Sequence, residues 1–291
     1  MSLSPNSIHS EMKKVFTRCK KPSKVFNTWR KTHLLREFFP ELYHTINIDQ
    51  SQKNENLDLY YHIMYAMDSV PLEQSNALLI RLAALLHDIG KPHTEVYTDT
   101  GRHFYDHERV GKVLGGVILR RWGFSNKLIN KVLLLVENHL FNLTASSTQT
   151  SIKKLIGKVG PSNIHDLLDL RIADRYGSGK KNMSMYKVES LRRKINTILT
   201  KVSPENFKLD LSDTDIRSIL KETTEEGLID RTVPYVKSYL EKKIIVGRLK
   251  NKKTNLKKMI KFISKIQCPL DTPHLFQTWA DLAIENADLL D

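Results

Sequence analysis

Apolar residues recur at three- and four-residue intervals along most of the chain, and this spacing predicts helices. The clearest case is Leu82-Ala83-Ala84-Leu85-Leu86, an apolar run that indicates a helix buried on most of its circumference. With boundaries set by proline, glycine and capping residues, the pattern predicts helices over 57–70, 76–89, 108–122, 128–139, 151–159, 164–176, 187–201, 214–221, 233–248 and 254–266. We therefore expect an all-α fold.

Less regular stretches separate these helices. Between Ile8 and Leu42 the mixed apolar spacing predicts two or three short helices that end before Pro40. Residues 49–56 and 177–182 are polar or glycine-rich and predict loops. Within 94–105 a turn signature, Thr98-Asp99-Thr100-Gly101, is compatible with a small β-hairpin or with a longer irregular segment.

Two serines are expected to cap helices. Ser125 precedes the helix that begins near Leu128, and a serine at this position can accept a hydrogen bond from the first turn. Ser212 and Asp215 have the spacing of a capping pair in which each side chain bonds the other residue's backbone. The composition also shifts near Pro204, so a boundary is expected there.

Charge favours a polyanionic partner. The chain of 291 residues has a formal net charge of +14 and a pI of about 9.6. From Lys237 to Lys265 there are eleven lysines and arginines against the single acidic residue Glu241. Nucleic acid is the commonest partner of such a surface, although a solvated lysine-rich face has the same composition.

Several protein classes are not expected. No apolar run approaches the length that a bilayer requires, and the first six residues lack the pattern of a signal peptide. Cys19 and Cys268 lie at opposite ends without CxxC spacing, which predicts free buried thiols. We therefore expect a cytoplasmic protein with no membrane partner; the pattern leaves its oligomeric state open.

A candidate metal site begins where the central apolar helix ends in His87 and Asp88. Neutral imidazole and ionised carboxylate are both metal ligands, but one pair cannot hold a catalytic ion. Further candidates lie at helix ends or junctions: His62, His107, His139 and Asp174. Since an unpaired buried imidazole or carboxylate is costly, shared coordination of a metal would satisfy these groups together.

Each candidate alone also has a structural explanation. His62 follows Tyr60-Tyr61 and is compatible with a hydrogen-bonded core histidine. Asp174 lies between Arg171 and Arg175, so it could belong to a salt bridge on its own helix. Structural roles are also expected for His93, His103 and His165. Of these three, His103 is close enough to the candidate residues to line a pocket.

The order His62, His87-Asp88, His107, His139, Asp174 resembles that of the HD-domain metal-dependent phosphohydrolases. Within that superfamily, Leu85–Pro92 and Gly101–Glu108 resemble the HD domain attached to bacterial CCA-adding tRNA nucleotidyltransferases. Looser similarity to the helical body and tail of those enzymes extends over residues 12–16, 34–38, 39–42, 59–62, 211–219 and 236–256.

The resemblance implies a domain organisation: an N-terminal helical body segment over 1–45, an all-α HD phosphohydrolase domain over 46–203 and a basic C-terminal helical tail over 204–291. The catalytic head of those enzymes carries a glycine-serine turn and paired aspartates on strands, and nothing in these residues matches it. Asp213-Thr214-Asp215 has similar letters but lies at a predicted helix start. We therefore expect a hydrolase rather than a nucleotidyltransferase.

The resemblance also implies a ligand set. His62, His87, Asp88 and Asp174 would hold one divalent ion, and Asp88 would bridge to a second ion held by His107 and His139. Two adjacent cations can lower the pKa of a bridging water and stabilise both the attacking and the leaving oxygen of a phosphate. Mixed imidazole and carboxylate ligands suit Mn, Fe, Co, Ni or Zn, and Mg stays open.

Further residues are assigned to catalysis and substrate binding. The candidate catalytic residues are His87, Asp88 and Lys91. The Lys91 ammonium could neutralise a phosphate oxygen in the transition state. Alternatively, Lys91 is an ordinary cation at the C-terminus of a helix. The candidate substrate-binding residues are Lys91, Arg102, His103 and Arg175.

The expected activity is metal-dependent hydrolysis of a phosphoester in a nucleotide or RNA, with a 2′,3′-cyclic or terminal phosphate as the leading choice. One alternative is a non-catalytic RNA or tRNA-binding module with a vestigial HD site and a basic tail. Another is a nucleoside-triphosphate or alarmone hydrolase with the same metal chemistry. Six clustered polar groups favour an enzyme, because a structural core has little need of them.

Overall fold

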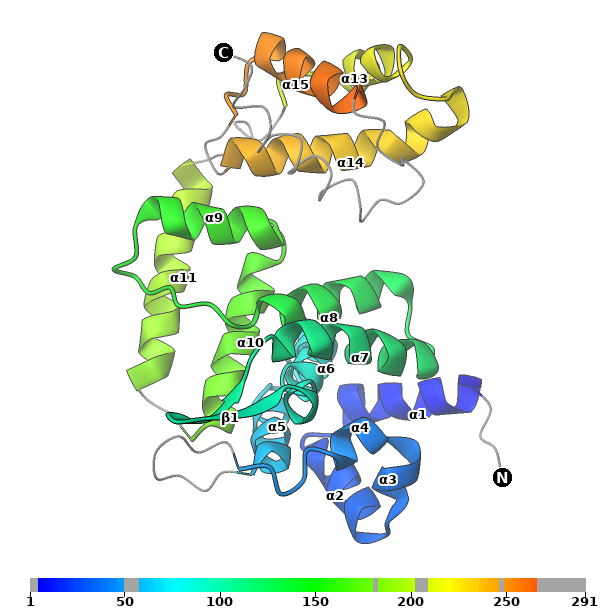
Figure 1. The fold of residues 1–291 in the computed structure, drawn as a ribbon, viewed down its shortest axis with the longest axis vertical. Helices are drawn as coiled ribbons and strands as arrows, with labels where there is room; N and C mark the ends of the chain where they lie inside the picture. Colours follow the sequence, from blue (N-terminus) through cyan, green and yellow to red (C-terminus); the bar gives the residue numbers. More distant parts are fainter. Residues whose placement is uncertain (1–4, 50–57, 180–182, 202–208, 246–248, 266–291) are drawn as a thin grey trace. The chain divides into compact units, whose positions relative to one another are not determined.

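A computed structural model describes residues 5–49, 58–179, 183–201, 209–245 and 249–265 (Figure 1). Over these residues the chain is helical apart from one two-stranded sheet and one short 3-10 helix, so the all-α prediction is confirmed. None of the described helices is long and apolar enough to cross a membrane.

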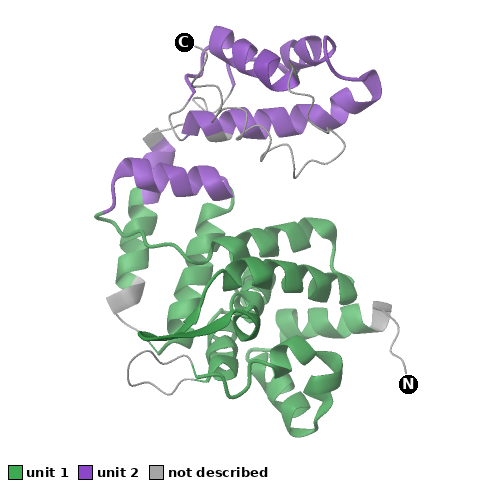
Figure 2. Cartoon of the chain, in the orientation of Figure 1, with its two compact units in different colours: residues 1–146, 161–194 green, residues 147–160, 195–291 purple. Residues whose placement is uncertain are grey.

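The chain divides into two compact units (Figure 2). Unit 1 comprises residues 1–146 and 161–194, and unit 2 comprises residues 147–160 and 195–291. The three-part organisation with boundaries at 45 and 203 stays a prediction.

Unit 1 begins with four helices: α1 (Pro5–Arg18), α2 (Ser23–Lys31), α3 (Leu34–Phe38) and α4 (Pro40–Tyr43). Phe16, Phe26 and Phe39 are fully buried among them, and the rings of Phe16 and Phe39 contact Trp122. Three of these helices end before Pro40, as predicted, but the fourth, which begins at Pro40, was not expected. Proline lacks an N–H and has a fixed φ, both of which suit the first position of a helix, and Pro40 occupies that position in α4.

Five longer helices form the rest of the unit's core: α5 (Leu59–Asp68), α6 (Ala77–Leu86), α7 (His107–Arg121), α8 (Asn126–Asn138) and α10 (Ile164–Gly177). α6 packs against α5, α7, α8 and α10, which explains its apolar circumference. Ser125 caps α8 by accepting a hydrogen bond from the Leu128 N–H, as predicted.

Arg81 is the charged exception inside α6, and it is completely buried. Its guanidinium donates to the carbonyl oxygens of Phe16 (2.9 Å), Cys19 (2.8 Å) and Val70 (2.8 Å). Burial lowers the pKa of Arg81, while Asp68 opposes that shift. Because the fork of donors fills three backbone acceptors, Arg81 fastens α1 and the end of α5 to the central helix.

A hairpin connects α6 to α7. After the 3-10 turn η1 (Lys91–His93), β1 (Glu95–Thr98) pairs antiparallel with β2 (Gly101–Phe104) in the register Glu95↔Phe104 to Thr98↔Gly101. Of the two predicted alternatives for this segment, the structure forms the hairpin. Asp106 (φ 56°) then turns the chain into α7 in the left-handed conformation that aspartate tolerates.

The remaining helices are α9 (Gln149–Val159), α11 (Met183–Lys201), α13 (Asp213–Leu220), α14 (Glu226–Ile245) and α15 (Lys253–Lys265). In unit 2, α13, α14 and α15 share an apolar core that includes Ile216, Leu240 and Leu256. Ser212 and Asp215 form the predicted capping box at the start of α13.

Other helix predictions differ in their bounds. α14 begins at Glu226 and runs through Pro234, instead of beginning near Val233, because buried Ile229 and Val233 extend its apolar face upstream of the proline. Gly177 belongs to α10, while the predicted breaks at 50–56 and 180–182 lie outside the described residues. Cys19 is a free thiol but only half-buried, and Cys268 lies outside the described residues.

Candidate metal centre

Five helices of unit 1 bring the six predicted ligand residues together. His62 lies in the first turn and a half of α5, and His87 caps the C-terminus of α6, with Asp88 next to it. His107 begins α7, His139 follows the last residue of α8, and Asp174 lies in the last turn of α10. Helix packing buries the apolar rows of these helices and leaves the polar ends facing one another.

The first group consists of His62, His87 and Asp174. The Nε2 atoms of His62 and His87 are 3.0 Å apart. Asp174 Oδ1 lies 3.4 Å from His62 Nε2 and 3.7 Å from His87 Nε2. These three residues come from three helices, so their convergence is a product of packing.

The second group consists of Asp88, His107 and His139. Asp88 Oδ1 lies 3.2 Å from His107 Nε2 and 3.5 Å from His139 Nε2. The other oxygen, Oδ2, lies 3.3 Å from the Nε2 atoms of both His62 and His87. Asp88 therefore presents one carboxylate oxygen to each group, which is the placement that a bridging ligand requires.

Backbone carbonyl groups orient three of the imidazoles. Nδ1 of His87 lies 2.8 Å from the Ala84 oxygen, that of His107 2.7 Å from the Phe104 oxygen and that of His139 2.7 Å from the Val136 oxygen. Because a carbonyl oxygen can only accept, each Nδ1 must carry the proton. In a neutral ring, the Nε2 lone pair then points towards the centre, as in metal-ligating histidines.

This arrangement fits a cation. Neutral Nε2 atoms and carboxylate oxygens are all acceptors, so at these separations a positive charge among them, either a metal ion or a proton on an imidazole, must offset the repulsion of their lone pairs. His107 Nε2 is buried and makes no hydrogen bond within the described structure. Ligands about 2.1 Å from one ion stand roughly 3.0–3.4 Å from each other, close to the observed spacings. The two groups could therefore hold divalent metal ions; the ligand role of each residue stays a prediction.

The pKa values respond to the same electrostatics. Burial alone would lower the pKa of His87, but Asp88 and Asp174 outweigh it and raise that pKa to about 10. Burial would raise the pKa of Asp88, yet His87 and Lys91 hold it well below its ordinary value. The pKa of Asp174 is likewise lowered, because His87 and His62 overcome the effect of burial. The centre thus attracts positive charge.

Lys91 and Asp174 are more exposed than the other residues of the centre. Lys91 Nζ lies 2.6 Å from Asp88 Oδ2, and 15% of the Lys91 side chain is exposed. The Asp174 side chain keeps 16% of its surface exposed, while the Asp88 side chain keeps 4%. Solvent therefore reaches these two side chains more easily than the buried histidines.

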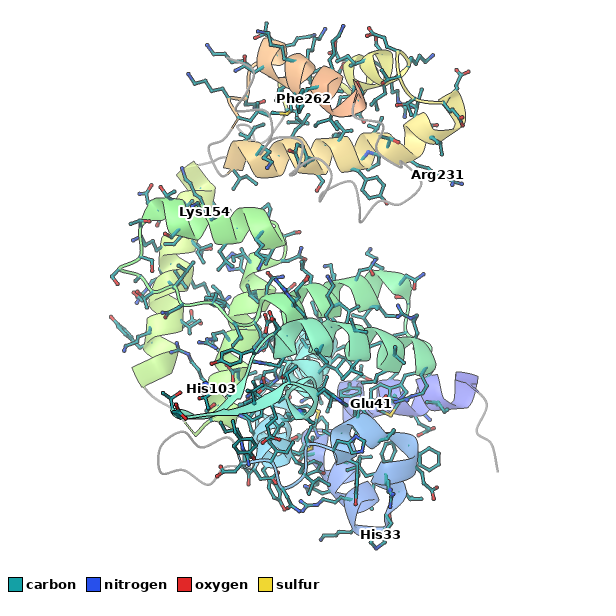
Figure 3. All side chains as sticks on the ribbon, viewed as in Figure 1. His33, Glu41, His103, Lys154, Arg231 and Phe262 are labelled. Carbon is teal, nitrogen blue, oxygen red and sulfur yellow. The ribbon has the colours of Figure 1, made fainter. Side chains whose placement is uncertain are left out.

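Two of the other predicted substrate residues lie on the hairpin. Arg102 pairs with Glu95 (2.8 Å) and donates to the Asp49 carbonyl oxygen (3.0 Å). His103, labelled in Figure 3, stacks on Tyr105 with ring centroids 5.3 Å apart. His103 is opposite Val96 in the hairpin, which puts it on the other face of the sheet from Arg102.

Arg175 follows Asp174 on α10 and is half-buried. Burial and the neighbouring Arg171 lower the pKa of Arg175, and Asp174 opposes them. The salt bridge considered for Asp174 also exists, because Arg171 Nη1 lies 2.9 Å from Asp174 Oδ2. Asp174 therefore presents Oδ1 to the histidines and Oδ2 to Arg171.

Sequence reasoning missed the residues that support the ligands. Ser178 Oγ lies 3.5 Å from His62 Nδ1 and donates to the Asp174 carbonyl oxygen. A side chain at Gly177 would approach the His62 carbonyl oxygen to 2.6 Å. For the backbone carbonyl groups that orient the imidazoles, the sequence holds one signal: each group lies three residues before its histidine. The pairs are Ala84 and His87, Phe104 and His107, and Val136 and His139. Clearance at a glycine has no signal in a single sequence.

Comparison with known proteins identifies the class of domain that carries this site. Residues 42–178 match the model of the HD domain, and all six converging residues lie within that range. This match agrees with the resemblance to the HD domain that the sequence predicted.

Similar proteins include two tRNA nucleotidyltransferases and a multifunctional CCA protein. The chain is 35% identical over 123 residues to an A-adding tRNA nucleotidyltransferase of Deinococcus radiodurans, which covers 41% of this chain and 28% of that protein. It is 26% identical over 211 residues to a multifunctional CCA protein of Legionella pneumophila, covering 70% of this chain and 50% of that protein. A CC-adding tRNA nucleotidyltransferase of Thermus thermophilus is 30% identical over 118 residues, which cover 38% of this chain and 26% of that protein. The chain thus spans at most half of each relative.

Proposed function

We propose that the chain is a metal-dependent phosphohydrolase that acts on a phosphoester of a nucleotide or RNA, with a 2′,3′-cyclic or terminal phosphate as the first choice. One observation carries the proposal: Asp88 presents one oxygen to His62 and His87 and the other to His107 and His139. The HD domain match and the tRNA named in the relatives support the metal chemistry and the nucleic acid substrate respectively.

The residues of this chain have separable tasks in the proposed reaction. His62, His87, Asp88 and Asp174 would hold one ion, and His107 and His139 would hold a second through Asp88. Divalent ions bound there supply a water of lowered pKa and charge for the phosphate oxygens. Mn, Fe, Co, Ni and Zn suit these ligands, and Mg is a further candidate.

Lys91 stabilises developing negative charge in this proposal. Its ammonium pairs with Asp88 and is partly exposed, so a phosphate bound at the centre would come within reach of it. The carbonyl groups of Ala84, Phe104 and Val136 keep the protons of three histidines on Nδ1, away from the reacting atoms. Arg175 stays a proposed substrate contact because it follows Asp174 on α10.

The test is hydrolysis of 2′,3′-cyclic AMP and of terminally phosphorylated oligoribonucleotides, assayed with each metal in turn. His87→Ala and Asp88→Ala are each expected to lower kcat/KM at least roughly 100-fold, because each removes a ligand from a centre worth several kcal/mol. His93→Ala is the matched control, since His93 is an exposed neighbour outside the six residues. Equal rates for wild type and Asp88→Ala, with contaminating activity excluded, would refute the proposal.

A non-catalytic tRNA-binding module is the second candidate, and the tRNA named in the relatives favours it. Its basic tail is partly neutralised, because Lys253 and Lys257 pair with Asp215, and Lys261 pairs with Glu222. Steeply salt-dependent tRNA binding without turnover on any phosphoester under any metal would select this candidate over the hydrolase.

A further inference from the structure

The hairpin between α6 and α7 is tied to the metal centre through Phe104. The Phe104 carbonyl oxygen bonds Nδ1 of His107 at 2.7 Å, and the Phe104 ring lies 5.6 Å from Lys91 Nζ. Lys91 in turn pairs with Asp88. The face of the sheet that carries the Phe104 side chain therefore begins beside Lys91, which pairs with Asp88 of the centre.

Four side chains share this face. Glu95 is opposite Phe104 and Tyr97 is opposite Arg102, and residues two apart on a strand point to the same side. Lys91 lies beside Phe104, and two residues farther along the strands Arg102 and Tyr97 are opposite each other. The acidic Glu95 is opposite Phe104, and its charge is paired with Arg102. Tyr97 lies two residues beyond Phe104 in the register, or roughly 7 Å along the strand.

Tyr97 is held rigidly although 68% of it is exposed. Its hydroxyl lies 2.9 Å from Glu95 Oε1 and accepts from Arg102 Nη2 at 2.5 Å. Arg102 Nε also pairs with Glu95 Oε1, and its guanidinium carbon lies 5.1 Å from the Tyr97 ring centroid. These bonds and the contact with Arg102 hold in one orientation an aromatic ring that stays mostly exposed, and ordering the ring in this way costs side-chain entropy. Such pre-organisation is useful when a partner stacks on the ring.

We propose that this face of the hairpin binds the unpaired nucleotides that precede the reacting phosphate at the end of a single-stranded RNA. This inference rests on the proposed hydrolase, and it selects an RNA end over a mononucleotide. Phe104 would contact the nucleotide that carries the reacting phosphate, and Tyr97 would stack on the next base. Stacking on tyrosine suits every base, and the chain's net charge of +14 favours a polyanion. Arg102 is a positioning residue, because its nitrogens hold Tyr97, Glu95 and the Asp49 carbonyl.

The binding test uses metal-loaded full-length protein and a short 2′-O-methyl RNA with a 3′-hydroxyl, which offers no reacting phosphate. 2-Aminopurine at the penultimate position reports stacking by loss of its fluorescence. Wild type is expected to quench the probe, and Tyr97→Phe, which keeps the ring but loses the hydroxyl bonds to Glu95 and Arg102, is expected to quench it with weaker binding than wild type. Tyr97→Ala is expected to abolish the quenching and weaken binding about 5- to 150-fold, the range for loss of one stacked base.

Tyr186→Ala is the matched control for this test. Tyr186 on α11 is also 68% exposed and also lies beneath an arginine, with the Arg193 guanidinium 5.7 Å from its ring. It should quench and bind as wild type does. If Tyr97→Ala quenches and binds like wild type, or if Tyr186→Ala has the same defect as Tyr97→Ala, the inference is wrong.

A kinetic test separates this inference from the proposed function. Tyr97→Ala should raise KM for an oligoribonucleotide ending in a 2′,3′-cyclic phosphate and leave kcat/KM for 2′,3′-cyclic AMP within about 2-fold of wild type, because the mononucleotide does not reach the ring. Equal effects on both substrates would overturn the inference while the hydrolase stands. Absence of all hydrolysis by wild type would overturn the hydrolase, and the fluorescence result would still decide whether Tyr97 binds RNA.

Discussion

The His107 carbonyl oxygen occupies the space where a side chain at position 90 would begin. Gly90 has helical dihedrals (φ −81°, ψ −17°), so its backbone conformation does not require glycine. A Cβ there would overlap that oxygen and approach the Gly111 nitrogen to 2.7 Å. Both neighbours are backbone atoms and cannot rotate away. The close approach lets the turn after Asp88 lie against the start of α7, where His107 is.

Gly90→Ala is therefore expected to cost about 1–3 kcal/mol of stability, the range for overpacking, and to weaken metal binding by displacing His107. Gly111→Ala, on α7, is the control, since a Cβ at position 111 would meet Leu86 O and Val136 Cγ1 at an ordinary 3.4 Å. Thermal unfolding and metal titration of the two variants provide the measurements. A Gly90→Ala protein with wild-type stability and metal affinity would show that the turn can move.

At the scale of elements, the start of α13 is joined to α15 through Asp215. Asp215 Oδ2 accepts from Ser212 N (3.3 Å) and from Ser212 Oγ (2.8 Å), and its carboxylate pairs with Lys253 (3.0 Å) and Lys257 (3.3 Å). The hydrogen bond from Ser212, with Lys253 next, lowers the pKa of Asp215. One carboxylate thus caps a helix and holds a second helix against it.

Because the pKa of Asp215 is lower in the folded than in the unfolded chain, its stabilisation is present above the ordinary aspartate pKa near 3.9 and lost as the pH falls below it. Asp215→Asn should therefore lower the unfolding midpoint of unit 2 at pH 7 and flatten its decline in acid. Asp213→Asn is the control, since Asp213 lies in the same helical turn and pairs with Lys237 of α14, whereas Asp215 pairs with two lysines of α15. Identical acid profiles for Asp215→Asn and wild type would contradict the assignment.

At the scale of the whole molecule, all six candidate ligands belong to unit 1 and none to unit 2 among the residues that the structure describes. A ligand that binds only the folded state stabilises it by mass action. Metal should therefore stabilise unit 1 by about 2.7 kcal/mol when its free concentration is 100 times its dissociation constant.

Hydrogen exchange resolved by peptide checks this expectation. Removal of metal with a chelator should speed exchange in α5, α6, α7, α8 and α10, whose ends carry the ligands, and leave α13, α14 and α15 unchanged. A response of equal size in both units, or no response in unit 1, would contradict a metal centre confined to these helices. The Asp88→Ala protein, which lacks the bridging carboxylate, should not respond to the chelator.

Much of the local structure follows from the sequence. The apolar run before His87 predicts a buried helix because it leaves no polar face for water, and Ser125 and Ser212 mark helix starts because their side chains replace missing backbone acceptors. Differences arose where a proline suits two local structures: Pro40 begins a short helix that was not predicted, and α14 begins upstream of Pro234, at Glu226.

The sequence by itself determined the helices, the residue types of the candidate ligands and their resemblance to an HD domain, because periodicity, capping and motif spacing are properties of neighbouring positions. Only the tertiary structure decided that Asp88 faces both groups of histidines, that Gly90 and Gly177 leave room for that approach, and that Tyr97 is fixed beside the centre. These facts depend on the directions of side chains up to 112 positions apart, from His62 to Asp174, and the packing of helices against one another sets those directions.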